Sequence, residues 1–222
     1  SPAGAAGAPG QAAVPGPRGL VAFSSTAANL TDSHPAGQRD VYVRDLQTDK
    51  TTLVSATPDG APGDGASSAP AISPDGRYVS FTTTATNLVS GTTLSGTNVV
   101  VRDLSAGTTA LASVSSPHVQ VIRAGERSAP LISDVSSGGR AVVFESKASD
   151  LVSRDTNNHA DVFVRDMVAN RTVRASLATT DQQADAPSLP PSITPAGRYV
   201  ASPSTPPHPP PRPPPPPHPP PP

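Results

Sequence analysis

The chain has 222 residues, with 16 lysines and arginines against 17 aspartates and glutamates, and it contains no cysteine. This nearly neutral charge gives no electrostatic reason to expect nucleic acid or an anionic membrane surface as a partner, and the lack of cysteine excludes disulfides and thiolate metal sites. No apolar run approaches the length of a membrane span, so we expect no membrane insertion.

Residues 1–17 are rich in alanine, glycine and proline. Such a composition cannot bury enough apolar surface to order itself, so we predict a flexible segment. As it stands it has neither the charged start nor the apolar core of a signal peptide. It is open to interpretation as the mature end after cleavage, a linker or the cut edge of a fragment.

A seven-residue motif occurs three times, as DVYVRDL from Asp40, NVVVRDL from Asn98 and DVFVRDM from Asp161. The spacings between the copies are 58 and 63 residues, and a phenylalanine recurs at the same two spacings (Phe23, Phe81 and Phe144). Self-similarity at such a period is typical of repeat architectures. The sequence therefore predicts three repeats of about 60 residues.

Each repeat contains short runs rich in valine, threonine and tyrosine, bounded by glycine, proline, aspartate and serine, which is typical of β-strands and turns. No stretch shows a helical apolar period. Four strands per repeat are therefore predicted, and in the second repeat they cover residues 68–73, 77–83, 98–104 and 108–114.

A tight turn is predicted between the first two strands of a repeat. In SPDG (Ser73–Gly76) proline presets the backbone angle and glycine can take the left-handed conformation that follows. TPAG (Thr194–Gly197) keeps both residues. The middle repeat has SDVSSGG (Ser133–Gly139) instead, which predicts a loop three residues longer and looser.

One four-stranded sheet cannot bury both faces, and the radial stacking of such sheets in a β-propeller solves this problem. The hairpin PAISPDGRYVSF followed by DVYVRDL resembles the WD-like repeat of TolB-type bacterial propellers, from about Gly19 to Ala201. The resemblance implies an all-β fold, a partial β-propeller of three four-stranded antiparallel blades plus the start of a fourth. We assign the blades to residues 18–67, 68–127 and 128–187, with a partial blade at 188–202.

The likeness between repeats ends at Ser202, where the repeat period predicts phenylalanine, and a proline-rich segment follows at 203–222. Two interpretations compete. One is a polyproline II tail that serves as a spacer or as a ligand for aromatic grooves. The other, which we favour because the change falls inside a strand, is a frameshift in a GC-rich gene or an incomplete gene. The encoding DNA distinguishes them.

Asp155, Asn157 and Asp161 offer oxygen ligands at a spacing that Ca²⁺ can use. They are weak candidates, because the other repeats carry different residues there and the glycine and distal glutamate of an EF-hand are absent. The alternative is a polar turn whose side chains bond their own backbone. No other cofactor is expected, and nothing suggests that the histidines before the tail converge on a zinc site (His34, His118 and His159).

An Arg-Asp pair ends each repeated strand (Arg44-Asp45, Arg102-Asp103 and Arg165-Asp166). Neighbouring residues on a strand point to opposite faces, so we expect cross-strand or blade-to-blade partners in a structural role. All seven aromatic residues fall in repeat columns and are predicted to fill the core (Phe23, Phe81, Phe144, Tyr42, Phe163, Tyr78 and Tyr199). No aromatic platform remains for stacking bases, so nucleic acid is not an expected partner.

The resemblance implies a non-catalytic propeller scaffold that binds an unknown protein or ligand at its face, in the periplasm or outside the cell. The sequence contains no G-x-S-x-G, H-E-x-x-H or P-loop motif, so no catalytic residues are predicted and the chain is not expected to be an enzyme. Two alternatives stay open: the propeller portion of a larger prolyl oligopeptidase-like hydrolase, and a calcium-stabilised structural module.

Overall fold

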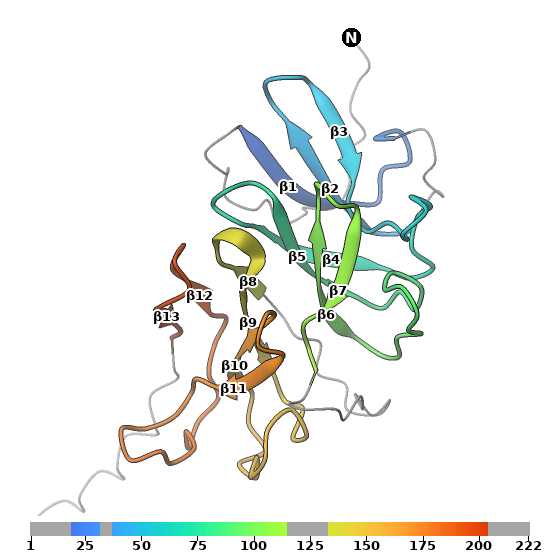
Figure 1. Ribbon diagram of the computed structural model, residues 1–222. Helices are drawn as coiled ribbons and strands as arrows, with labels where there is room; N and C mark the ends of the chain where they lie inside the picture. Colours follow the sequence, from blue (N-terminus) through green and yellow to red (C-terminus); the bar gives the residue numbers. More distant parts are fainter. Residues whose placement is uncertain (1–18, 32–36, 115–132, 204–222) are drawn as a thin grey trace, which may run out of the picture.

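The computed structural model describes residues 19–31, 37–114 and 133–203 (Figure 1). Regular structure in this part of the chain is almost entirely strand, and none of these residues belongs to a helix long and apolar enough to cross a membrane. The elements are β1 (Leu20–Ser25), β2 (Asp40–Asp45), β3 (Lys50–Leu53), β4 (Ser67–Ile72), β5 (Tyr78–Thr83), β6 (Asn98–Asp103), β7 (Thr108–Leu111), β8 (Ser133–Val135), the 3₁₀ helix η1 (Ser137–Gly139), β9 (Ala141–Ser146), β10 (Asp161–Asp166), β11 (Arg171–Arg174), β12 (Ser192–Ile193) and β13 (Val200–Ala201).

The strands form four antiparallel sheets, which follow the predicted repeats and are named here blades one to four. Blade two has the order β4-β5-β6-β7 and blade three the order β8-β9-β10-β11, so strands adjacent in sequence are adjacent in the sheet. Within the described residues, blade one contributes β1-β2-β3 and blade four β12-β13. The predicted all-β, partial β-propeller is confirmed. The segment 1–17 and the tail from residue 204 lie outside the described residues.

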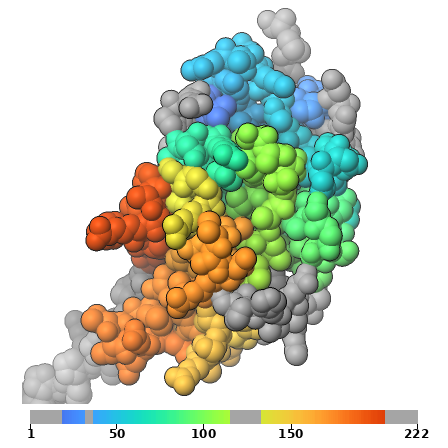
Figure 2. Space-filling view, viewed as in Figure 1, coloured from blue at the N-terminus to red at the C-terminus, as the bar shows by residue number. Residues whose placement is uncertain are grey.

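Hydrophobic cores lie between consecutive blades. On β6, Val100 packs into a cluster with Phe81 and residues of blade one, whereas Val99 and Val101 pack into a second cluster with blade three. This division follows from the two-residue period of a strand, which sends alternate side chains to opposite faces. Figure 2 shows the consequence, since the colours of successive blades meet in direct contact. The apolar face of each sheet is thus removed from water by the sheet of the neighbouring blade.

The predicted turn chemistry is confirmed in blades two and four. Gly76 and Gly197 have φ angles of 73° and 71°, and their N–H groups donate to the carbonyls of Ser73 and Thr194 at 2.8 Å in each case. The left-handed conformation explains the glycine in both turns, because a side chain is disfavoured there.

The longer loop predicted at Ser133–Gly139 is wrong. Residues 133–135 form β8, and the turn from Ser136 has the same length as the SPDG turn. The Ser136 hydroxyl accepts from the Ala141 N–H at 3.0 Å, as the Ser73 hydroxyl accepts from the Tyr78 N–H at 2.9 Å. The hairpin of blade three is therefore no longer than that of blade two.

The repeated Arg-Asp pairs have the predicted structural role. Each arginine reaches a threonine on the next strand, and Arg102 also donates to the Ala56 carbonyl of blade one at 2.9 Å. Each aspartate accepts backbone N–H groups of the turn that follows it. Asp103 also accepts Arg77 at 2.7 Å, which lowers the pKa of its carboxyl to about 2. In each pair the arginine thus contacts the next strand, whereas the aspartate holds the turn that follows it.

Among the aromatic side chains, Tyr199 departs from the prediction. Phe81, Phe144 and Phe163 are fully buried, as expected, but Tyr199 is 62% exposed. The equivalent Tyr78 packs on the hairpin of the next blade, since a Cβ added to Gly139 would meet its ring. Nothing in the described residues covers Tyr199 in the same way.

Candidate functional site

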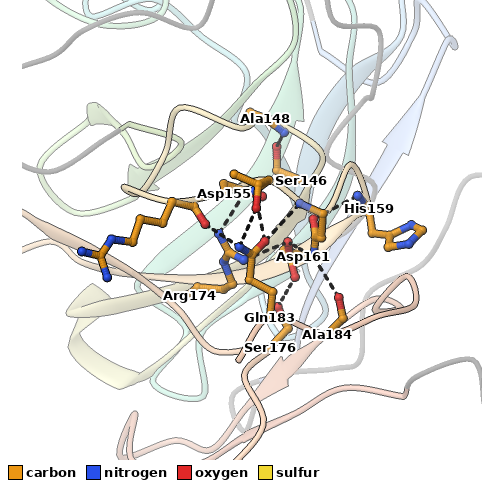
Figure 3. Close-up of polar contacts among 12 residues, drawn as sticks. Ser146, Ala148, Asp155, His159, Asp161, Arg174, Ser176, Gln183 and Ala184 are labelled. Carbon is orange, nitrogen blue, oxygen red and sulfur yellow. Dashed lines mark hydrogen bonds and ion pairs between the residues drawn. The ribbon is translucent and has the colours of Figure 1, made fainter. Parts of the chain in front are cut away.

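A cluster of polar side chains lies in blade three, with Asp155 and Asp161 beside Arg174 (Figure 3). The third predicted cation ligand, Asn157, is half-buried and donates to Asp161 at 3.0 Å. Asp155 and Asn157 come from the loop before β10, and Asp161 is the first residue of that strand. Arg174 ends β11, where it faces the start of β10. The antiparallel pairing of these two strands therefore brings the loop carboxylate and the strand-end arginine together.

Part of this cluster recurs in blade one. The Ser176 hydroxyl donates to Asp161 at 2.5 Å and accepts from the Val162 N–H at 3.1 Å. In blade one Ser55 makes the same two contacts, with Asp40 at 2.6 Å and with the Val41 N–H at 3.1 Å. A contact that occurs in two blades serves the fold, because it satisfies the backbone N–H of the second residue of β2 and of β10.

The arginine is specific to blade three. Arg174 forms ion pairs with Asp155 at 3.3 Å and with Asp161 at 3.6 Å, and the three side chains are at most 5% exposed. The matching positions in blades one and two are Leu53 and Leu111. Burial raises the pKa of the Asp155 carboxyl, Arg174 lowers it, and the charge of Asp161 raises it further. Blade three therefore replaces an apolar contact by a buried charge network.

Gln183 fixes the loop that carries this network. Its side-chain carbonyl accepts from the N–H groups of Thr156 and Asn157, at 3.1 Å in both cases. Its amide group donates to the Arg154 carbonyl at 2.6 Å and to the Thr156 hydroxyl at 3.0 Å. One side chain thus connects the loop before β10 to the hairpin after β11.

The three candidate cation ligands are brought together around an arginine. Arg174 supplies the positive charge between the two carboxylates. Asn157 turns its amide N–H group toward Asp161 at 3.0 Å, and its carbonyl accepts the His159 N–H at 3.1 Å. No group of three acidic or histidine side chains suited to a metal ion occurs among the described residues. His34 and His118 lie outside these residues.

Sequence reasoning missed Arg174 and Gln183. The available signal was the exchange of leucine for arginine at one position of an otherwise matching repeat, since Leu53 and Leu111 occupy that position elsewhere. A charge that appears in one blade alone points to a role beyond the shared fold.

The hairpin ends of three blades form a second feature, a continuous surface. Asp75 of blade two accepts the Gly138 N–H of blade three at 2.6 Å, and the Ser137 N–H donates to the Pro195 carbonyl of blade four at 2.9 Å. An exposed arginine follows each turn (Arg77, Arg140 and Arg198). We call these three turns and their arginines the hairpin end.

Comparison with known proteins gives structural similarities only. No family model matches the chain, and a search of curated proteins finds no significant match. Solved structures similar to it include TolB from Acinetobacter baumannii, with 16% identity and a TM-score of 0.47 over 83% of this chain and 34% of that one. A putative TolB from Agrobacterium tumefaciens has 15% identity and a TM-score of 0.44, over 85% and 71% of the two chains.

A prolyl endopeptidase structure is also similar, with 14% identity and a TM-score of 0.48, over 87% of this chain and 26% of that one. The chain spans about a third of the length of the Acinetobacter TolB. By its own four antiparallel sheets and its repeated hairpin, the chain is a partial β-propeller.

Proposed function

We propose that the chain is a non-catalytic binding module of the cell envelope or the extracellular space, and that it recognises a protein partner at its hairpin end. The resemblance to TolB-type repeats supports the compartment. The hairpin end supports the binding surface, because binding residues are often placed on loops held by a rigid scaffold.

One observation carries the proposal: three turns from three blades are joined by direct contacts into one surface, with an arginine on each. Arg77 and Arg140 pair with Asp103 and Asp166, at 2.7 and 3.4 Å. In blade four, the described residues supply no such aspartate for Arg198, whose guanidinium lies 5.2 Å from the centre of its neighbouring tyrosine ring. Arginine is enriched where protein interfaces gain most of their energy, so an acidic partner surface is expected.

The test uses the immobilised chain and an envelope extract of the cells that encode it. A captured protein is identified, purified and titrated against the wild type and against Arg198→Glu. Reversing the exposed charge is expected to weaken binding at least tenfold, because like charges across an interface repel. A partner whose affinity is unchanged in Arg198→Glu, and also in Arg140→Glu, would show that the hairpin end is not the binding surface.

The alternative of a hydrolase propeller predicts a different gene. A downstream domain with a G-x-S-x-G motif in the same reading frame would favour that alternative, whereas further blades followed by a stop codon would favour the binding module. Sequencing the encoding DNA beyond the last codon distinguishes the two.

A further inference from the structure

We propose that blade four accepts an extended segment of a protein partner, which adds to the free edge of β13 as a further strand. Within the described residues β13 is the last strand of its sheet, whereas β1, β5 and β9, which hold the same place in blades one to three, each pair with another strand on that side (Figure 1). The inference deepens the proposed function and rests on it in one respect, namely that a protein partner contacts Arg198.

The backbone of β13 presents hydrogen-bonding groups to this edge. The Tyr199 carbonyl accepts an N–H of its own turn at 2.9 Å, so the neighbouring Arg198 and Val200 face the open side. At the position of Arg198 in blades two and three, the carbonyls of Arg77 and Arg140 accept N–H groups that follow β6 and β10, at 2.9 and 2.8 Å. No N–H group of the described residues donates to the Arg198 carbonyl. Such a strand edge is a template for pairing with another chain.

The face of blade three beside this edge is uncovered. Ala175 is exposed, whereas Val54 and Ala112, at the same position of blades one and two, are fully buried against the next blade. Leu177 is likewise 41% exposed, whereas Ala56 at its position in blade one is 3% exposed. A strand added to β13 would therefore remove from water an apolar surface that the next blade covers in the other repeats.

Two cavities, of about 350 and 600 Å³, lie between this face and blade four. Val162 lines the first and Val164 the second, so the cavities follow one another along the same face of β10. Val200 belongs to the far wall of the first cavity, and the turn at 195–197 to that of the second. Alternate side chains of an added strand would point into this row of cavities.

The repeats indicate which segment fits. At this place β2, β6 and β10 share the pattern V-x-V-R-D, in which x is tyrosine, valine or phenylalanine. In blades one to three x pairs with a phenylalanine, and in blade four Ser202 takes the position of that phenylalanine. The smaller side chain leaves room for an aromatic residue at x. We therefore expect a partner segment with an aromatic residue there.

The charged end of the pattern also has a place in blade four. Asp103, the aspartate of the pattern in blade two, pairs with Arg77 at 2.7 Å. Arg198 holds the position of Arg77 and has no such partner among the described residues. An aspartate of the added strand would lie opposite Tyr199, as Asp103 lies opposite Tyr78, and would meet this arginine.

Neither the chain itself nor a second copy offers this segment. Each of the three strands that carry the pattern, β2, β6 and β10, is already paired on both sides. Residues 206–222 are mostly proline, which has no N–H group for a strand ladder, and residues 1–17 contain no acidic residue. The occupant that fits is therefore a segment of a different protein.

The probe is the peptide DVYVRDL, the sequence of residues 40–46, which carries fluorescein at its N-terminus and is titrated with the full chain by fluorescence anisotropy. In blade one the Leu46 N–H faces β1 and the Val41 N–H faces the other side, so the N–H groups of Tyr42 and Val43 alternate likewise. N-methylation of the tyrosine in the peptide should weaken binding about tenfold or more, because it removes a bond to β13. N-methylation of the valine that follows is the matched control and should leave binding unchanged.

Two variants of the chain test the same edge from the other side. Val200→Pro removes the N–H that faces the open side and should also weaken binding about tenfold or more, while the circular dichroism spectrum stays that of the wild type. Arg198→Thr should weaken binding of DVYVRDL about two- to fivefold, the effect of an exposed ion pair, and should not affect the peptide DVYVRNL. Arg140→Thr, in the turn of blade three, is the control for Arg198→Thr and should bind both peptides as the wild type does.

Equal affinities of the two N-methylated peptides, or no binding of DVYVRDL, would overturn the proposal. Self-association of the chain that Val200→Pro abolishes would assign the edge to a second copy, and would overturn it as well. Failure of the hairpin-end proposal has a different signature, because it is a captured partner that ignores Arg198→Glu and Arg140→Glu. The peptide titration gives its answer whichever partner is captured.

Discussion

The contact between blades two and three gives a sharp prediction for Gly139. Its φ is 65°, and a Cβ added there would lie 2.6 Å from a ring carbon of Tyr78. The adjacent Gly138 has a φ of 72°, but a Cβ there would meet nothing within 4 Å. The two glycines therefore share the backbone cost of a side chain and differ in the steric conflict with the neighbouring blade.

The magnitudes follow from these two terms. Gly138→Ala should lower the free energy of unfolding by about 1–2 kcal/mol, the cost of a left-handed residue with a side chain. Gly139→Ala should lower the free energy of unfolding by about 1–3 kcal/mol more than Gly138→Ala does, because Tyr78 must leave its packed position against the core between the blades. The expected difference between the two variants is therefore about 1–3 kcal/mol.

Urea unfolding followed by circular dichroism measures both values, with the slope of the transition as a check that the same surface is exposed. The same pair of variants is then made in a Tyr78→Ala background, which removes the ring. The difference between Gly139→Ala and Gly138→Ala should fall close to zero there. Equal destabilisation in the original background, or a difference that persists without the ring, would refute the proposed contact.

Four further predictions address other contacts. Arg77 holds the pKa of Asp103 near 2, below its ordinary value of 3.8, so the stabilisation is present above about pH 4 and is lost as the pH falls toward 2. Arg77→Ala should therefore lower stability at neutral pH by a small amount, because solvent screens this exposed pair, and its unfolding curves should converge with those of the wild type below about pH 2. Ser55→Ala should cost about 1–3 kcal/mol in urea unfolding, because it removes the hydroxyl that joins Asp40 to a backbone N–H, and a cost below 0.5 kcal/mol would contradict this role. A chelator should leave the melting temperature unchanged, because Arg174 already supplies the positive charge between its two carboxylates; a fall of several degrees would instead support calcium. Sedimentation velocity should show association that increases with concentration, because most of the large apolar side chains that are exposed in the described residues lie in blades three and four; a monodisperse monomer at all concentrations would contradict this.

Local chemistry predicted the elements of this fold well. Proline and glycine in SPDG determine the turn, and the two-residue alternation of valines on β6 determines which side chains can face each neighbouring blade. The register of the third hairpin could not be predicted in this way. SAPLIS and SAPAIS align by sequence, yet Ser136 takes the turn position and residues 133–135 pair with β9. The register of a strand is decided by its pairing partner and by which side chains face the core, and not by local sequence similarity.

The sequence alone determined the repeat, the all-β class and the stacking of small sheets, since these depend on periodicity and turn residues within a few positions along the chain. Only the tertiary structure decided which positions carry unusual chemistry. Arg174 became a buried ion-pair partner because strand pairing and Gln183 bring distant segments against it. Tyr199 stays exposed because burial is decided by what packs on a residue, and not by the column it occupies.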